Sequence, residues 1–206
     1  MTEIFYYVTR KTYNNSYVSK EEFGKMNIYV LLKKTFDTED KIVVNDGQIE
    51  DDGAEFIINP YDEYAIEEAI VQRDKHGGEV TVVTVGDEDS EKQLRTALAM
   101  GADKAVLINT EDDLDEGDQY TTAKILEAFF EDKEVDLILA GNVAIDEASG
   151  QVGPRLAERL NIPYVTTIVG LEIDGDTANI EKDVEGDIEK IEVKLPLLVT
   201  CQQGLN

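Results

Sequence analysis

A glycine-containing loop, residues 141–153, is the stretch of this chain whose residue types and spacing could do chemistry. It comes after the apolar run 135–140 and leads into a helix-forming segment. In open α/β sheets, a buried strand that feeds such a turn and then a helix presents backbone N–H groups to a phosphate. Gly141, Gly150 and Gly153 permit conformations and close approaches that a side chain would block. The loop therefore predicts a nucleotide-binding site.

The composition limits which ligands this loop can bind. Among 206 residues, 45 are acidic and 19 are basic, and the net charge of −26 disfavours a nucleic-acid partner. A small phosphate ligand stays compatible, because exposed charges more than roughly 8 Å apart are largely screened at physiological salt. No run reaches the roughly 20 apolar residues of a membrane span, and the first residues lack a secretory pattern. With Cys201 as its one cysteine, the chain is expected to be cytoplasmic, with no disulfide and no metal site.

Strands and helices alternate between residues 27 and 160. The strands are predicted in four apolar runs: 27–32, 79–86, 104–109 and 135–140. The helices are predicted at 60–76, 90–100, 119–130 and 154–160. Asn59 and Ser90 are expected to cap the first two helices, and Gly101 to end the second. This alternation is typical of right-handed βαβ units in a parallel sheet that is covered on both faces.

The pattern changes after residue 160. Extended segments are predicted at 164–173, 177–184 and 188–194, with turns at Gly175 and Gly186, and a final strand at 196–200. The expected fold class is therefore α/β: an open, mostly parallel sheet with helices on both faces, in a Rossmann-type three-layer arrangement. A small antiparallel β meander completes it near the C-terminus.

Residues 1–25 differ from the rest, because they carry tyrosines and asparagines without a sustained period. We expect a leader that is disordered or a mis-assigned start, with Met26 as the natural first residue. Residues 26–206 are expected to form a single nucleotide-binding α/β domain.

Four separated motifs resemble the β subunit of electron transfer flavoprotein, the FixA family. They are the helix start 59–61, the segment 95–103, the loop 141–153 and the segment 180–200. The resemblance covers residues 26–206 in unbroken order and implies the adenine nucleotide alpha hydrolase-like version of the three-layer fold. The leader has no counterpart in the family. The family's C-terminal arm, which embraces the alpha subunit, is expected to be missing after Asn206.

The resemblance implies an electron transfer protein and not an enzyme, with no catalytic residue in this chain. Its partner would be the alpha subunit, in a heterodimer that carries one FAD held mostly by that subunit. Electrons would pass from acyl-CoA dehydrogenases of fatty acid beta-oxidation, and related flavoenzymes, to a membrane quinone oxidoreductase. The β subunit itself would bind a structural AMP, or a second FAD if the protein is bifurcating.

The family's AMP site falls on the ends of predicted strands and on the loop. The implied residues are Leu31, Asn59, Pro60, Tyr61, Asp62, Val85, Gly141, Asn142, Val143, Ala144, Ile145, Asp146, Glu147, Ala148, Ser149, Gly150, Gln151 and Val152.

Physical reasoning adds roles for some of these residues. The N–H groups of residues 149–152 lie at a predicted helix start and could hold a phosphate without a lysine. Asp146 is a candidate acceptor for a ribose hydroxyl or an adenine amine, or else it only forms the turn. Gln151 is a candidate for a phosphate or ribose contact, or else it only caps the helix.

Two positions point toward partners. In the family, an aromatic residue at the position of Tyr61 lies toward the flavin, so Tyr61 would shield the flavin ring or form the pocket wall; a packing role is the alternative. Leu205 matches the family's partner-docking leucine, which inserts into a pocket of the dehydrogenase. Without the C-terminal arm, we expect the chain expressed alone to fold but to hold no FAD.

An alternative interpretation is a stand-alone adenine-nucleotide-binding regulatory protein of the universal-stress type. It would bind ATP as a homodimer, and the meander after residue 162 would be surplus to it. A nucleotide-hydrolysing enzyme has less support, because residues 141–153 lack the Lys-Ser/Thr ending of a P-loop.

Overall fold

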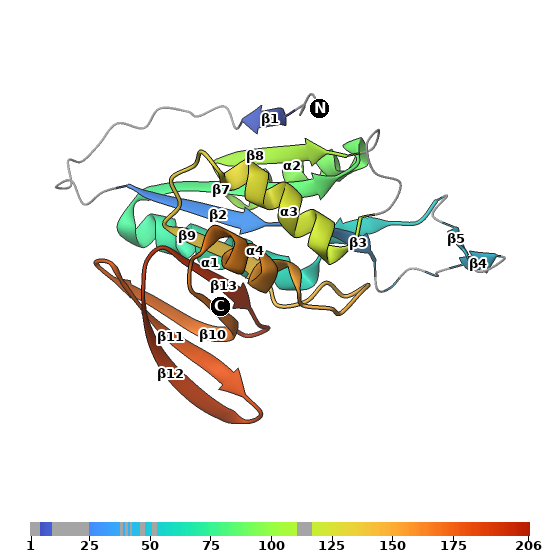
Figure 1. The fold of residues 1–206 in the computed structure, drawn as a ribbon. Helices are drawn as coiled ribbons and strands as arrows, with labels where there is room; N and C mark the ends of the chain where they lie inside the picture. Colours follow the sequence, from blue (N-terminus) through green and yellow to red (C-terminus); the bar gives the residue numbers. More distant parts are fainter. Residues whose placement is uncertain are drawn as a thin grey trace.

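A computed structural model describes residues 5–9, 25–37, 39, 41, 43–45, 48–50, 53–110 and 117–206. One sheet of nine strands forms its centre, in the order β1-β8-β7-β2-β9-β13-β10-β11-β12 (Figure 1). In chain order these strands are β1 (Phe5–Thr9), β2 (Met26–Leu31), β7 (Gly78–Gly86), β8 (Lys104–Asn109), β9 (Leu137–Gly141), β10 (Tyr164–Asp174), β11 (Thr177–Val184), β12 (Asp187–Lys194) and β13 (Leu197–Cys201). The helices are α1 (Pro60–His76), the short 3-10 helix η1 (Glu88–Ser90), α2 (Glu91–Met100), α3 (Gln119–Phe130) and α4 (Val152–Leu160).

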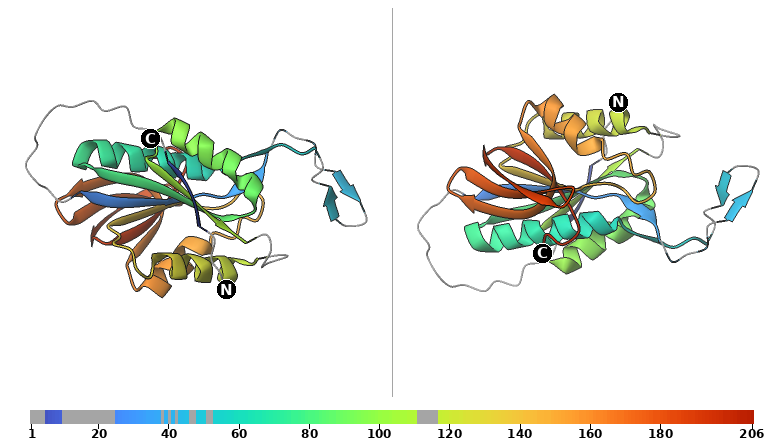
Figure 2. Two further views of the ribbon diagram at one scale, coloured as in Figure 1. Left: turned by 90° about the horizontal axis from the view of Figure 1, so that it is seen from above. Right: turned by 90° about the horizontal axis from the view of Figure 1, so that it is seen from below.

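The helices form two outer layers around the sheet. Figure 2 shows α1 and α2 on one face and α3 and α4 on the other. The strands from β8 to β10 pair in parallel, and β11 and β12 are joined to them in antiparallel pairing. The predicted fold class, including the C-terminal meander, is confirmed.

The alternation of side chains along β2 explains why both faces are covered. Ile28 and Val30 are fully buried in the cluster beneath α1 and α2, whereas Tyr29 and Leu31 pack toward α3 and α4. Successive side chains of a strand point to opposite faces, so a strand that is apolar at every position needs a helical layer on each side. β2 is therefore held between two apolar layers, and its carboxyl end has a fixed position.

The helix ends correct two expectations. α1 begins after Asn59 and α2 after Ser90, but neither side chain makes a capping hydrogen bond. Instead, Asp87 accepts the N–H of Ser90 at 3.2 Å, at the start of η1. The predicted cap positions were right and the predicted capping side chains were wrong. Gly101 ends α2 with a φ of +136°, as its glycine predicts.

A narrow arm projects from the body between β2 and α1 (Figures 1 and 2). At its base β3 (Lys34–Phe36) pairs with β6 (Phe56–Ile58), and farther out β4 (Val43–Asn45) pairs with β5 (Gln48–Glu50). The rings of Phe36 and Phe56 lie 4.6 Å apart between centroids. The apolar runs 42–44 and 56–58 predict two short extended pieces, and the structure has β4 and β6 at these places. Ile42 lies outside the described residues.

Part of the expected leader belongs to the sheet. β1 pairs antiparallel with β8, with Phe5 opposite Ile108. Residues 1–4 and 10–24 of the leader lie outside the described residues, as do residues 111–116 of the acidic loop before α3. The proposal that Met26 is the natural start stays a prediction.

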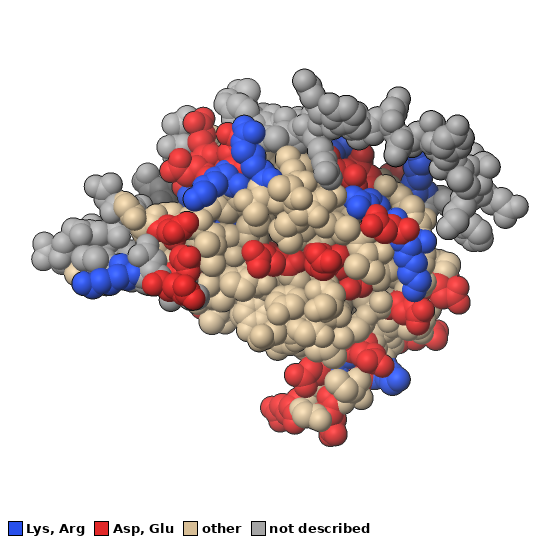
Figure 3. All heavy atoms as spheres, turned by 180° about the vertical axis from the view of Figure 1, so that it is seen from behind, with Lys and Arg blue, Asp and Glu red and all other residues tan. Residues whose placement is uncertain are grey.

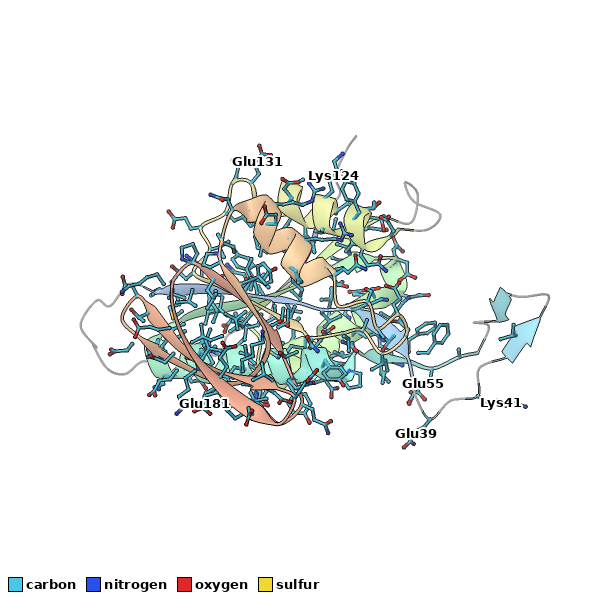
Figure 4. The ribbon with its side chains drawn as sticks, turned by 60° about the horizontal axis from the view of Figure 1, so that its bottom comes forward. Glu39, Lys41, Glu55, Lys124, Glu131 and Glu181 are labelled. Atoms are coloured by element: carbon cyan, nitrogen blue, oxygen red, sulfur yellow. The ribbon has the colours of Figure 1, made fainter. Side chains whose placement is uncertain are left out.

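Charged side chains lie on the periphery. Seen from behind, a broad area of other residues is crossed by a short row of acidic groups, and further acidic and basic groups lie around it (Figure 3). Lys124, Glu131 and Glu181 point away from the body, and Glu39, Lys41 and Glu55 lie on the arm (Figure 4). Within the described ranges, no helix is long and apolar enough to cross a membrane, and no cluster of three His, Cys, Asp or Glu side chains could hold a metal ion.

Candidate functional site

The chain reverses its direction across the sheet at β2, and a cavity opens there. From β2 the chain first reaches β7 by way of α1, and later returns by way of α3 to β9 on the other side of β2. Such a topological switch point leaves a crevice at the carboxyl ends of the strands, where open α/β sheets bind ligands. The cavity found there has a volume of about 300 Å³.

The walls of the cavity come from the ends of four strands, the loop after β9, and the first turns of α3 and α4. The described lining residues are Leu31, Leu32, Lys33, Asn59, Asp62, Val83, Val85, Gly86, Thr110, Gly117, Asp118, Gln119, Thr121, Thr122, Ile125, Leu126, Ala140, Gly141, Asn142, Val143, Ala144, Glu147, Ser149, Gly150, Gln151, Val152, Gly153 and Thr200.

The predicted site residues divide between this cavity and its surroundings. Most of them, drawn from all the predicted segments, line the cavity together. Pro60, Tyr61, Ile145, Asp146 and Ala148 do not line it. The prediction from the sequence therefore grouped residues that are far apart along the chain and line one cavity. It did not separate them from the five residues that do not line it.

The start of α4 offers hydrogen-bond donors to the cavity. The N–H groups of residues 149–152 have no acceptor within the described part of the chain. Gly150 has a φ of +60°, a left-handed conformation in which a side chain would be strained. Free N–H groups and the positive end of a helix attract an anion. This arrangement can hold one phosphate group.

A close approach of helix to sheet brings these donors into place. A Cβ atom at Gly153, in the first turn of α4, would lie 3.0 Å from Cγ2 of Thr200 on β13. Thr200 is buried, and its hydroxyl donates to Oδ1 of Asn142 at 3.2 Å. Because Gly153 has no side chain, α4 can pack closely against β13, the strand that forms one cavity wall.

Asn59 ties the start of α1 to the loop. Its Nδ2 atom donates to the carbonyl oxygen of Val143 at 2.9 Å, and its Oδ1 atom accepts the N–H of Ile145 at 3.2 Å. The side chain is 1% exposed, so these bonds are shielded from water. Asn59 therefore positions the loop, a role that the capping interpretation missed.

Asp62 ties three elements together at the floor of the cavity. Its carboxylate accepts the N–H of Lys33 at 2.7 Å, the N–H of Gly141 at 3.0 Å and Nδ2 of Asn59 at 3.0 Å. Burial raises the pKa of the Asp62 carboxyl to about 7, although these hydrogen bonds and the Lys33 charge act in the opposite direction. This carboxyl can therefore change its charge near neutral pH.

Gly141 permits this junction. A Cβ atom there would overlap Oδ1 of Asp62 and would lie 2.8 Å from Cβ of Tyr61. Only a glycine lets the end of β9 approach the start of α1 so closely. Tyr61 is half-buried at this junction, outside the cavity lining.

Lys33 holds the acidic part of the loop. Its Nζ atom lies 2.9 Å from Oδ1 of Asp146 and 3.3 Å from Oε1 of Glu147. On the other side, Nε2 of Gln119 in α3 donates to Oε2 of Glu147 at 2.8 Å. These contacts lower the pKa of Glu147, the Gln119 hydrogen bond most, and burial opposes them. Asp146, the predicted ribose or adenine acceptor, has its carboxylate next to a lysine.

Two other candidate residues have partners within the chain. Arg155 donates through two nitrogen atoms, at 3.0 and 2.6 Å, to Oε1 of Gln151. The side-chain oxygen of Gln151 is therefore engaged, and its amide nitrogen is the group left for a ligand. The half-buried Leu205 packs against the cluster beneath α1. Their proposed ligand and partner contacts stay predictions.

The sequence reasoning missed the wall that α3 contributes. Asp118 accepts the N–H and the hydroxyl of Thr121, at 2.8 and 2.7 Å, and these bonds lower the pKa of its carboxyl. An Asp at the position before a helix, with a Thr three residues later, is a helix-start pattern that could have been recognised. Lys33 was also missed, although it comes directly after a predicted strand.

Comparisons with known proteins agree with this geometry. The electron transfer flavoprotein domain family matches residues 46–206. The chain is 67% identical over 181 residues to the electron transfer flavoprotein subunit beta of Bacillus subtilis, which covers 88% of this chain and 70% of that protein. The subunit beta of Thermoanaerobacterium thermosaccharolyticum is 44% identical over 182 residues, with the same coverage of 88% and 70%.

A relative with a different name extends the comparison. The caffeyl-CoA reductase-Etf complex subunit CarD of Acetobacterium woodii is 39% identical over 184 residues, covering 88% of this chain and 70% of that subunit. The residues matched by the family include the loop and the cavity strands β7, β9 and β13, whereas β2 precedes them. The chain therefore belongs to the electron transfer flavoprotein beta-subunit family, the FixA family, whose members are electron transfer proteins associated with a flavin.

Proposed function

We propose that this chain is the β subunit of a heterodimeric electron transfer flavoprotein and that its cavity holds AMP as a structural nucleotide. The observation that carries the nucleotide site is the row of free N–H groups at the start of α4, beside a cavity at the switch point. Membership in the beta-subunit family supports the alpha subunit as the partner.

The cavity fits a nucleoside monophosphate. Its volume of about 300 Å³ is at the lower end of the range of small-molecule sites, roughly 300 to 1,000 Å³. Leu31, Val85 and Ile125 supply apolar surface for a base, and the α4 start supplies donors for a phosphate. AMP is therefore the ligand we favour.

The charges of the lining favour AMP over a second FAD. Among the described lining residues Lys33 is the one basic side chain, whereas Asp62, Asp118 and Glu147 are acidic. A second phosphate would have to lie near carboxylates, and like charges in a site of low polarity repel each other strongly. A pyrophosphate is thus less suited to this cavity than a single phosphate.

The flavin belongs to the proposed heterodimer. FAD would be held mostly by the alpha subunit and supplies the redox chemistry, which this chain's own side chains do not provide. Tyr61 would present its ring toward the flavin from the start of α1. One AMP would fill the described cavity, and the flavin would then lie at the interface with the alpha subunit.

The proposed partners rest on the family. Electrons would come from acyl-CoA dehydrogenases or related flavoenzymes and pass to a membrane quinone oxidoreductase, in the cytoplasm. Leu205 would contribute to docking. The alternative of a universal-stress type regulator is less favoured, because the β10–β12 meander and the matched family both belong to the first proposal.

The nucleotide proposal can be tested by adding a charge at the phosphate position. We expect Ser149→Glu to weaken AMP binding by about tenfold or more, because a carboxylate would compete for the α4 N–H groups. Binding of adenosine, which has no phosphate, should change much less. Isothermal titration calorimetry with AMP and with adenosine measures both.

The matched control is Thr96→Glu, which adds the same charge on the exposed face of α2. This variant should bind AMP as the wild-type chain does. Equal losses of AMP and adenosine affinity in Ser149→Glu would contradict a phosphate site at the start of α4. Co-expression with the alpha subunit, followed by measurement of bound FAD, tests the heterodimer.

A further inference from the structure

One side chain joins the two sides of the cavity mouth. Glu147 receives Nζ of Lys33 at 3.3 Å from the end of β2, and Nε2 of Gln119 at 2.8 Å from the start of α3. All three residues line the cavity. We call Lys33, Glu147 and Gln119 the Glu147 bridge. Through side chains alone, it connects the segment after β2, the loop after β9 and the start of α3.

The rest of the loop shows why this bridge matters. Asn59 fixes the first half of the loop through Val143 and Ile145. Between Ile145 and the start of α4, Asp146 and Glu147 attach the loop to other elements through their side chains. The backbone after them includes Ala148 with a φ of +53°, which is strained for a residue with a side chain. The N–H of Ala148 donates to the carbonyl oxygen of Ala144 at 2.7 Å, which holds this half of the loop to its own first half. The bridge is what attaches it to α3.

We propose that Glu147 is a positioning residue that holds the loop over the cavity, and that breaking the Glu147 bridge opens the cavity for nucleotide exchange. The first part stands on the described contacts, and the second part rests on the proposed nucleotide site.

The contacts of the Glu147 bridge are weak enough to break and form again. The side chain of Lys33 is 40% exposed and that of Glu147 is 44% exposed. Ion pairs this exposed are screened by water and salt and contribute little individually. The Gln119 hydrogen bond adds a second attachment on the same carboxylate. The bridge thus keeps the loop closed most of the time without locking it.

Each contact can be removed separately. Glu147→Ala removes the whole bridge, and Lys33→Met removes the charge while keeping the aliphatic chain. The chain offers a matched control in Lys34→Met, because Lys34 pairs with Asp87 at 2.7 Å and does not line the cavity. A control for Glu147 is Glu91→Ala, which removes an ion pair with Arg95 on α2.

The first measurement needs no nucleotide. In the full 206-residue chain, the N–H groups of Ile145 and Ala148 are hydrogen-bonded, to Oδ1 of Asn59 and to the carbonyl oxygen of Ala144. We expect amide hydrogen exchange at these two residues to become about threefold to tenfold faster in Glu147→Ala, in line with the loss of one hydrogen bond and one exposed ion pair. Lys33→Met breaks the contacts of Lys33 with both Asp146 and Glu147 but leaves the Gln119 hydrogen bond, so it should also speed exchange, and both controls should match the wild type. Unchanged exchange in Glu147→Ala would overturn the positioning role, provided that its circular dichroism spectrum is native.

The second measurement uses AMP as the probe. In Glu147→Ala we expect the AMP association and dissociation rates both to rise by about threefold to tenfold, so that Kd changes less than either rate. Faster amide exchange with an unchanged AMP dissociation rate would overturn the role in nucleotide exchange. If the wild-type chain does not bind AMP while the amide exchange differs as expected, the proposed function fails and the positioning role of Glu147 stands.

Discussion

At the scale of single residues, Asp62 shows how a buried acidic group can organise a site. It joins the end of β2, the start of α1 and the end of β9 through three hydrogen bonds. From the sequence, Asp62 was expected only to line the nucleotide pocket. Its partners Lys33 and Gly141 are 29 and 79 positions away, so no local pattern could reveal their contact.

The pKa of Asp62 predicts a pH dependence of stability. The carboxyl titrates at about 7 in the fold and near 4 in the unfolded chain. Between these values the folded state binds the proton and the unfolded state does not. The contribution of this group to stability is therefore complete below about pH 4 and is lost as the pH rises through about 7.

We expect the free energy of unfolding of the wild-type chain to fall relative to that of Asp62→Asn as the pH rises from about 4 to 8, by at most about 4 kcal/mol. Urea titrations at a series of pH values measure this difference. The exposed Asp132→Asn serves as the control for the substitution itself. A flat difference for Asp62→Asn would show that the folded pKa is not raised.

At the scale of elements, long periodic segments were predictable, whereas of the short strands only the apolar β4 and β6 were. The bounds of β8 and α3 agree with the prediction, because their apolar residues repeat over a full element. β3 and β5 have three residues each, too few to display a period. Their existence depends on pairing with β6 and β4 across the arm, which is a tertiary property.

The same distinction applies to the site. The strand ends and the loop were predictable because parallel strands present their carboxyl ends at one edge. The contribution of α3 was not, because it depends on α3 crossing to the face that α4 also covers. The Lys33 contact with the loop likewise joins positions 33 and 147, and only the folded sheet brings them together.

A prediction at this scale concerns the contact of α4 with β13. Gly153→Val would force a branched side chain against Thr200 and Leu198. Even a Cβ atom alone, if added at this glycine, would lie 3.0 and 3.4 Å from their side chains. We expect a loss of about 1 to 3 kcal/mol in the free energy of unfolding from this overpacking. Urea denaturation measures it.

Gly117→Val is the matched control, because nothing lies within 4 Å of a Cβ atom at Gly117 in the same cavity wall. Its free energy of unfolding should stay within about 0.5 kcal/mol of the wild-type value. Equal effects of the two substitutions would mean that α4 does not depend on close packing at Gly153.

At the scale of the whole molecule, the net charge of −26 dominates the electrostatics. The acidic side chains lie mostly on the periphery, as Figures 3 and 4 show. Most ion pairs in the described residues are at least partly exposed and contribute little. When salt is added, the relief of repulsion among the excess carboxylates therefore outweighs the weakening of these pairs.

We expect the Tm of the chain to rise with NaCl concentration at neutral pH. Each kcal/mol of relieved repulsion should raise Tm by about 2 to 4 °C in a chain of this size. Differential scanning calorimetry from low salt to about 1 M NaCl, where the Debye length shortens to about 3 Å, measures the effect. A falling Tm would indicate that specific ion pairs, rather than general repulsion, control the stability.

The position of Thr200 in the cavity wall has a consequence for how the protein is made. The cavity needs Leu31 from β2 and Thr200 from β13, so its parts are synthesised far apart in time. A ribosome adds roughly 5 to 20 residues each second, which leaves the early strands waiting for β13 for many seconds. The proposed nucleotide would then bind only after β13 has been synthesised. A chain whose synthesis stops earlier would not bind that ligand.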